Sequence, residues 1–129
     1  MGLTAHPDPK FQAPPILPPK NGFLFLDRAK FPEFFSQDVP KDKAQFMAAS
    51  QAPLGVQAFS DKITKAAWKT KPSYYIISTE DRMIPPDAER MMAKRAGSKV
   101  SEIKSSHVSF ISHPKEIAAV IETAANSVK

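Results

Sequence analysis

The pattern of hydrophobic and polar positions becomes regular near residue 68, and the half of the chain after that point predicts clear elements. Tyr74 to Ile77 form a continuous run of β-prone side chains, which predicts a strand buried on both faces. Val100 to Ile103 predict a second, shorter strand. Between them, Pro85-Pro86-Asp87 opens a helix, and Gly97 is placed to close it in the left-handed conformation.

Two helices are predicted in this half. In the first, Ala88, Met91, Met92 and Arg95 share one face. The second helix begins near Pro114 and has the most regular amphipathic stripe in the sequence, made of Ile117, Val120, Ile121 and Ala124. The order strand, helix, strand, helix predicts a right-handed unit with parallel strands. Parallel sheets usually have more strands and are covered on both faces, so we expect the strand at Tyr74 to lack neighbours.

The first half of the chain is rich in proline and phenylalanine. Eight of the 13 prolines lie within the first 40 residues, and residues 1–20 are expected to be a loop or an extended arm. Residues 21–67 are expected to be a helical segment, with short helices rather than strands. The best of these is Lys41 to Gln51, whose Ala44, Met47 and Ala48 recur at helical spacing. Seven phenylalanines between Asn21 and Ser60 need a surface on which to pack.

Length and composition exclude several classes of protein. At 129 residues the chain is one modest domain or part of a larger one, and it has no cysteine for a disulfide, a thiol nucleophile or a thiolate metal site. Its longest apolar runs have four residues, so no membrane span is expected, and a cytoplasmic location is the simplest expectation. The net charge of +5 comes from interspersed charges of both signs, which argues against a nucleic-acid partner.

The candidate chemistry lies directly after the two predicted strands. Asp81 follows the first strand and His107 follows the second, and parallel strands bring their carboxyl ends to one edge of a sheet. A carboxylate held against one imidazole nitrogen leaves the other nitrogen to act as a general base. The alternative is structural: Asp81 as a turn residue and His107 as a loop residue that caps a helix.

The other candidates fit a site less well. Glu80 competes with Asp81 for the acid role, but adjacent side chains point in different directions, so only one of them can face His107. His6 lies in the proline-rich arm, and His113 precedes Pro114 at a helix start. Three scattered histidines predict no metal site, no cofactor is expected, and no substrate-binding residue can be assigned.

Three stretches of sequence carry a family resemblance: the segments 75–82 (YIISTEDR), 84–87 (IPPD) and 102–107 (EIKSSH). They resemble the α/β-hydrolase superfamily, and in particular the small bacterial hydrolases akin to plant methyl esterases and hydroxynitrile lyases. The resemblance implies an α/β fold in which 68–129 form the C-terminal strand-helix-strand-helix part. Residues 21–67 then look like a cap over the active site, and the N-terminal half of the sheet is absent. By the same resemblance Asp81 is the triad acid and His107 is the triad base.

One departure from the family concerns the nucleophile. The family places a serine in a G-x-S-x-G turn between a strand and a helix. The four glycines here, at positions 2, 22, 55 and 97, cannot form that motif, and neither Ser73 nor Ser109 has its context. We therefore expect a truncated ester hydrolase without a nucleophile, inactive alone, whose intact relative acts on a small-molecule ester. The alternative is a non-catalytic interaction module that completes its sheet by self-association or with a partner chain.

Overall fold

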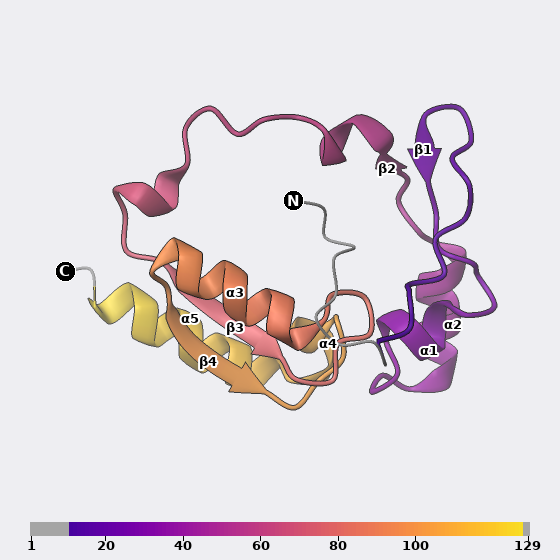
Figure 1. Cartoon of the computed structure of the whole chain (residues 1–129). Helices are drawn as coiled ribbons and strands as arrows, with labels where there is room; N and C mark the ends of the chain where they lie inside the picture. Colours follow the sequence, from indigo (N-terminus) through magenta and orange to yellow (C-terminus); the bar gives the residue numbers. More distant parts are fainter. Residues whose placement is uncertain (1–10, 128–129) are drawn as a thin grey trace.

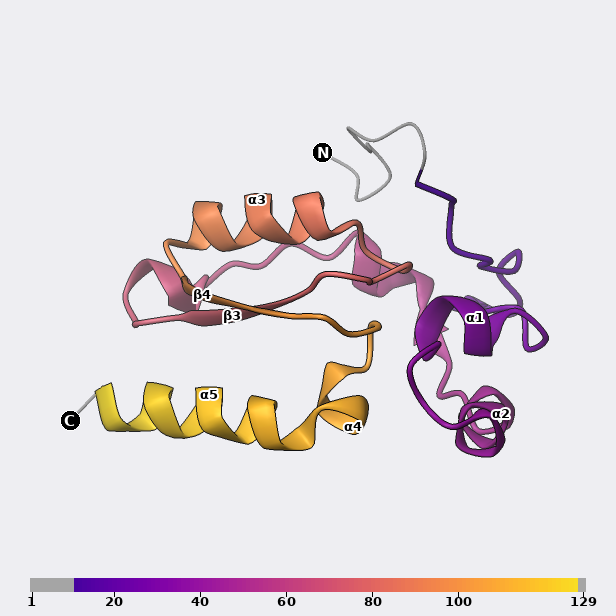
Figure 2. The same ribbon diagram turned by 90° about the horizontal axis from the view of Figure 1, so that it is seen from below.

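The computed structural model describes residues 11–127, and its central feature is a parallel pair of strands between two helices. Strand β3 (Tyr74–Ser78) pairs with β4 (Lys99–Ile103), with Tyr74 opposite Lys99 and Ser78 opposite Ile103. Helix α3 (Pro86–Ala96) covers one face of the pair and α5 (Pro114–Ser127) lies on the other (Figure 2). The predicted order of strand, helix, strand and helix is confirmed.

Helix α3 has the predicted ends but a different buried face. It begins after Pro85 and ends at Gly97, whose φ of 64° and ψ of 28° are left-handed. The predicted face is wrong at Met91, which is 55% exposed, and at Arg95, which is exposed. The face that packs on β3 is instead made of Ala88, Glu89, Met92, Ala93 and Ala96. The small alanines let the helix approach the strand closely, whereas the larger Met91 and Arg95 face outward.

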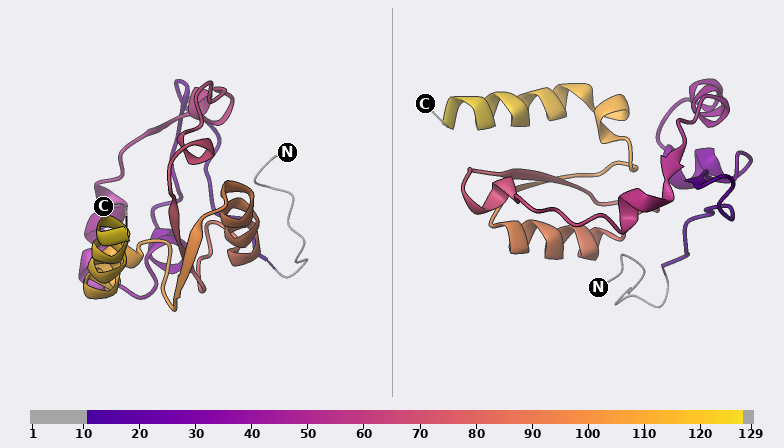
Figure 3. Two further views of the ribbon diagram at one scale, coloured as in Figure 1. Left: turned by 90° about the vertical axis from the view of Figure 1, so that its left-hand side faces the viewer. Right: turned by 90° about the horizontal axis from the view of Figure 1, so that it is seen from above.

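Helix α5 lies against the sheet less closely than its regular pattern suggests. Ile117, Val120 and Ala124 are half-buried, while Ile121 is 61% exposed and none of the helix's residues is fully buried. A short helix that the sequence pattern did not predict, α4 (Ser109–Ser112), leads into it. The end-on view in the left panel of Figure 3 shows the strands between α3 and α5.

The amino-terminal half combines short helices with a small antiparallel ladder. Helices α1 (Phe31–Phe35) and α2 (Lys41–Ala49) pack on each other, and Phe31, Phe34, Ala44 and Ala48 are buried. The expectation of helices without strands is wrong, because β1 (Phe23–Leu24) pairs with β2 (Leu54–Gly55). A separate hairpin precedes this ladder: Asn21-Gly22, with positive φ angles of 51° and 81°, make the tight turn between Lys20 and Phe23.

The two halves meet at the carboxyl edge of the parallel strands. Helices α1 and α2 lie beyond the ends of β3 and β4, and residues 60–73 run back along the molecule to the start of β3 (Figure 1). The 3-10 helix η1 (Val56–Phe59) precedes this return segment, and the segment itself has one short 3-10 helix, η2 (Ala67–Lys69). Among the described residues, no helix is both long enough and apolar enough to cross a membrane.

Candidate acid–base site

Asp81 is fixed by the turn that follows β3. Its carboxylate Oδ1 accepts hydrogen bonds from the backbone N–H groups of Met83, at 2.6 Å, and Ile84, at 2.9 Å. Its own N–H donates to the Ser78 carbonyl at 3.1 Å, and its side chain is only 1% exposed. The carboxylate is therefore held in one orientation, with Oδ2 directed away from the turn.

His107 completes the pair from the loop after β4. Its Nδ1 lies 2.7 Å from Asp81 Oδ2, and because a carboxylate can only accept, Nδ1 carries the proton and donates it. The Phe35 ring lies 4.8 Å from the imidazole, centroid to centroid, and the His107 side chain is 29% exposed. This geometry leaves Nε2 as the nitrogen able to accept a proton from a reacting group.

The loop that carries His107 is tied down on both sides. The Ser106 N–H donates to Asp38 Oδ2 at 2.8 Å, which links the loop to the turn after α1. Ser105 Oγ donates to Ser78 Oγ at 3.2 Å, and the Ser105 carbonyl accepts from the Glu80 N–H at 3.1 Å. Ser105 and Ser106 are fully buried, so the imidazole is placed by a rigid backbone.

Asp38 is a neighbour of the His107 loop that the sequence reasoning missed. Burial raises the pKa of its carboxyl, but hydrogen bonds from Ser106 and Ser112 outweigh burial and lower the pKa below its ordinary value. His113 Nδ1 lies 3.9 Å from Asp38 Oδ2 and 2.9 Å from Ser112 Oγ. No local motif announces this contact, because Asp38 and Ser106 are 68 residues apart in sequence.

Glu89 is the second residue that the sequence reasoning missed. It is 6% exposed on the inner face of α3, and its Oε2 accepts the Ser78 N–H at 2.9 Å. Burial, together with the nearby Asp81 carboxylate, raises its pKa to about 7. No local signal pointed to it, because Glu89 lies outside the helix face that the sequence pattern predicted.

The remaining candidates lie elsewhere. Glu80 faces Lys104 at 3.5 Å rather than His107, as expected if only one of the two adjacent acids can reach the histidine. His6 lies outside the described residues. Within residues 11–127 no group of three histidine, aspartate or glutamate side chains is close enough to hold a metal ion.

Neither serine considered above as a nucleophile occupies a nucleophile's position. Ser73 precedes β3, at the opposite end of the strand from Asp81, and its Oγ lies 2.8 Å from Ser98 Oγ. Ser109 begins α4 and is buried. The sharp strand-to-helix turn of a serine nucleophile has no counterpart at either position.

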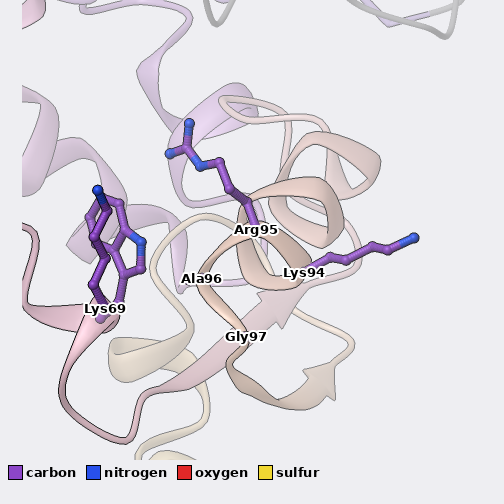
Figure 4. A pocket seen from close by; sticks show the side chains of 6 residues that line it. Lys69, Lys94, Arg95, Ala96 and Gly97 are labelled. Atoms are coloured by element: carbon purple, nitrogen blue, oxygen red, sulfur yellow. The ribbon is translucent and has the colours of Figure 1, made fainter.

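A hollow of about 490 Å³ lies away from the acid–base pair. Figure 4 shows it at the carboxyl end of α3, with Lys69 on the opposite side from Arg95 and Lys94 turned away; Trp68, Ala96 and Gly97 complete the lining. Asp81 precedes the amino end of the same helix, so the hollow and the pair are separated by an 11-residue helix, about 16 Å long. The hollow therefore does not serve His107.

The family follows from comparison with known proteins. The model of the alpha/beta hydrolase family matches residues 2–120, so this chain belongs to that family. No curated protein matches the sequence at a significant level.

Solved structures show the same fold. A methylesterase protein, MES16 from Arabidopsis, matches with a TM-score of 0.72 and 19% identity, over 85% of this chain and 48% of that one. Polyneuridine aldehyde esterase matches with a TM-score of 0.68 and 17% identity, over 79% of this chain and 43% of that one. The pyrethroid hydrolase PytH matches with a TM-score of 0.66 and 20% identity, over 87% of this chain and 47% of that one. The chain thus spans less than half the length of these esterases and hydrolases.

Proposed function

We propose that this chain supplies the acid and the base of a Ser-His-Asp ester hydrolase, with Asp81 as the acid and His107 as the base. The observation that carries the proposal is the 2.7 Å contact between His107 Nδ1 and an Asp81 carboxylate that two backbone N–H groups already hold. A turn residue needs no histidine partner, and a capping histidine needs no buried carboxylate. The pairing of both features favours the catalytic interpretation over the structural one.

In the proposed reaction, Nε2 of His107 takes the proton of a serine hydroxyl as that oxygen attacks the acyl carbon of the ester. Asp81 stabilises the resulting imidazolium and keeps Nδ1 protonated. The imidazolium then returns its proton to the departing alcohol, and water hydrolyses the acyl-enzyme by the same proton transfers. The esterase names of the structural relatives support a small carboxylic ester as substrate.

In this proposal the nucleophile and the oxyanion-binding N–H groups come from residues that this chain does not contain, since its glycines cannot form the G-x-S-x-G turn. The chain by itself is expected to give no enzymatic ester hydrolysis. Residues 21–67 are proposed to act as a cap, because the ring of Phe35 on α1 lies directly against the imidazole.

The test combines an ester with an activity probe. Purified chain, His107→Ala and the matched His113→Ala variant are each mixed with p-nitrophenyl acetate and, separately, with a fluorophosphonate that labels activated serines. Equal background rates and no labelled serine are expected. Turnover that His107→Ala alone abolishes, with one serine labelled, would show that the chain has its own nucleophile. That result would overturn the expected inactivity of the chain alone, while supporting His107 as the base. Reading the DNA upstream of Met1 completes the test. An in-frame G-x-S-x-G supports the proposal, whereas its absence, together with a strictly monomeric chain, contradicts it.

A second function is favoured by the edge of the sheet. Within residues 11–127, β3 and β4 hydrogen-bond only to each other as strands, and Ile121 on α5 is largely exposed. An interaction module would use this edge to pair with a second copy or a partner chain. Size-exclusion chromatography with light scattering distinguishes the two: a stable dimer supports the module, and a monomer that melts cooperatively counts against it.

A further inference from the structure

Glu89 lies directly behind the acid–base pair, and its burial needs an explanation. A glutamate is rarely this buried without a partner, because removing the charged form from water costs free energy. Its Oε2 accepts the Ser78 N–H at 2.9 Å, and the Asp81 carboxyl is close enough to raise its pKa. Two carboxylates can only accept, so a hydrogen bond between these two groups requires a proton on one of them.

We propose that Glu89 is a positioning residue of the Asp81–His107 pair, in which its protonated carboxyl donates a hydrogen bond to Asp81 while accepting one from the Ser78 N–H. This inference rests on the proposed function, since it assigns Glu89 a role only through Asp81. The two bonds link α3, the end of β3 and the turn that holds Asp81. They add a third support to the carboxylate, beside the N–H groups of Met83 and Ile84.

The charges around Glu89 explain why its pKa is raised to about 7. The titratable groups that face it are Asp81 on the turn after β3, His107 on the loop after β4 and Tyr75 on β3. Burial and the negative charge of Asp81 disfavour a second carboxylate there. The Ser78 N–H and a positively charged His107 favour it but do not compensate. The device is therefore sensitive to pH: when Glu89 loses its proton near pH 7, its bond to Asp81 is replaced by repulsion.

The conservative variant separates positioning from packing. Glu89→Gln keeps the shape, donates an amide N–H to Asp81 and still accepts from Ser78, but it cannot ionise. Glu89→Leu fills the same space without either bond. Glu122→Gln, at an exposed position on α5, is the matched control for loss of a carboxyl group.

The experiment uses nuclear magnetic resonance on the full chain. The Glu89 carboxyl carbon is followed with pH in the native protein, and the low-field His107 Nδ1–H signal is followed in all variants. We expect the Glu89 carbon to titrate near pH 7 and the His107 signal to shift through the same range. Glu89→Gln should retain the signal but lose that step, and Glu89→Leu should broaden or lose the signal. The Glu122→Gln profile should match the native one.

Titration of the Glu89 carbon below pH 5 would overturn the inference, as would a Glu89→Gln profile that overlays the native one. Either result counts against the inference only if the native chain shows the low-field His107 signal, because that signal reports the Asp81 contact itself. If the native chain lacks that signal, the proposed function fails instead, so the two failures can be told apart. The Glu89 carbon is measured without any substitution, so the inference stays testable even if a variant does not fold.

Discussion

Helices α3 and α5 flank the same two strands, yet the helix with the poorer amphipathic pattern is the better packed. Ala93 on α3 is fully buried beside Ala88 and Glu89, whereas α5 has no fully buried residue despite its regular stripe. Small side chains allow α3 to approach β3, and a carboxyl group completes the contact. Periodicity therefore identifies a helix face that can be covered, whereas its burial depends on side-chain size and on polar partners in three dimensions.

The largest expected effect contrasts one alanine on each helix. Ala93→Glu should lower the free energy of unfolding by about 3 kcal/mol or more, because a charged side chain is forced into a fully packed position. Ala119→Glu, at an exposed position on α5, should change it by less than about 0.5 kcal/mol. Urea unfolding followed by circular dichroism measures both. Similar losses for the two variants would mean that α5 packs as tightly as α3.

The next effect is a pH dependence of stability that belongs to α3. Because the pKa of Glu89 is raised from 4.5 to about 7 in the folded protein, its contribution is complete below pH 4.5 and is lost as the pH rises through 7. The free energy of unfolding should therefore fall by roughly 2–3 kcal/mol between pH 5 and pH 8. Glu89→Gln should remove most of this slope in urea titrations. A native protein whose stability is flat over this range would contradict the assigned protonation.

A smaller effect should follow from cutting the link between the two halves. Asp38→Ala leaves the buried Ser106 N–H without its acceptor, which should cost about 2 kcal/mol and let the His107 loop move. Asp42→Ala, on the exposed side of α2, is the matched control and should be close to neutral. Amide hydrogen exchange at Ser106 and His107 reports the loosening. Unchanged protection in Asp38→Ala would show that the loop does not depend on α1.

The smallest effect concerns the end of α3. Gly97→Ala should cost about 1 kcal/mol, because a side chain disfavours the left-handed conformation at φ 64°. Gly55→Ala is the matched control, since its φ of −63° suits any residue and its Cβ would meet no atom within 4 Å. Thermal melts of the two variants should differ by several degrees. Equal melting temperatures would mean that the carboxyl end of α3 frays in solution.

The sequence predicted the elements of the second half well because local signals agree there. Tyr74 to Ile77 reads as a strand, Pro85-Pro86 and Gly97 mark the helix, and the positions of Asp81 and His107 after parallel strands brought them to one edge. The hairpin at Asn21-Gly22 could also have been found, since that dipeptide favours its turn. The catalytic role of the pair remains a prediction.

Other parts of the site could not be predicted because they depend on distant contacts. Asp38 reaches Ser106 across 68 residues, and no local pattern encodes that meeting. Glu89 looks like a solvent-facing residue in a polar helix until the Ser78 N–H and Asp81 are placed beside it. Phe46 shows the opposite error of a sequence-based expectation: a large apolar side chain suggests burial, yet Phe46 is 71% exposed.

A single spectrum tests whether Asp81 and His107 form a hydrogen-bonded acid–base pair in this chain. In 15N-labelled protein, the His107 Nδ1–H should give a low-field proton signal, because the nitrogen donates to Asp81 Oδ2 at 2.7 Å. Asp81→Asn should abolish or strongly shift that signal while the backbone spectrum stays folded, and Glu80→Gln should leave it in place. A native spectrum without the signal, or an unchanged signal in Asp81→Asn, would contradict the account.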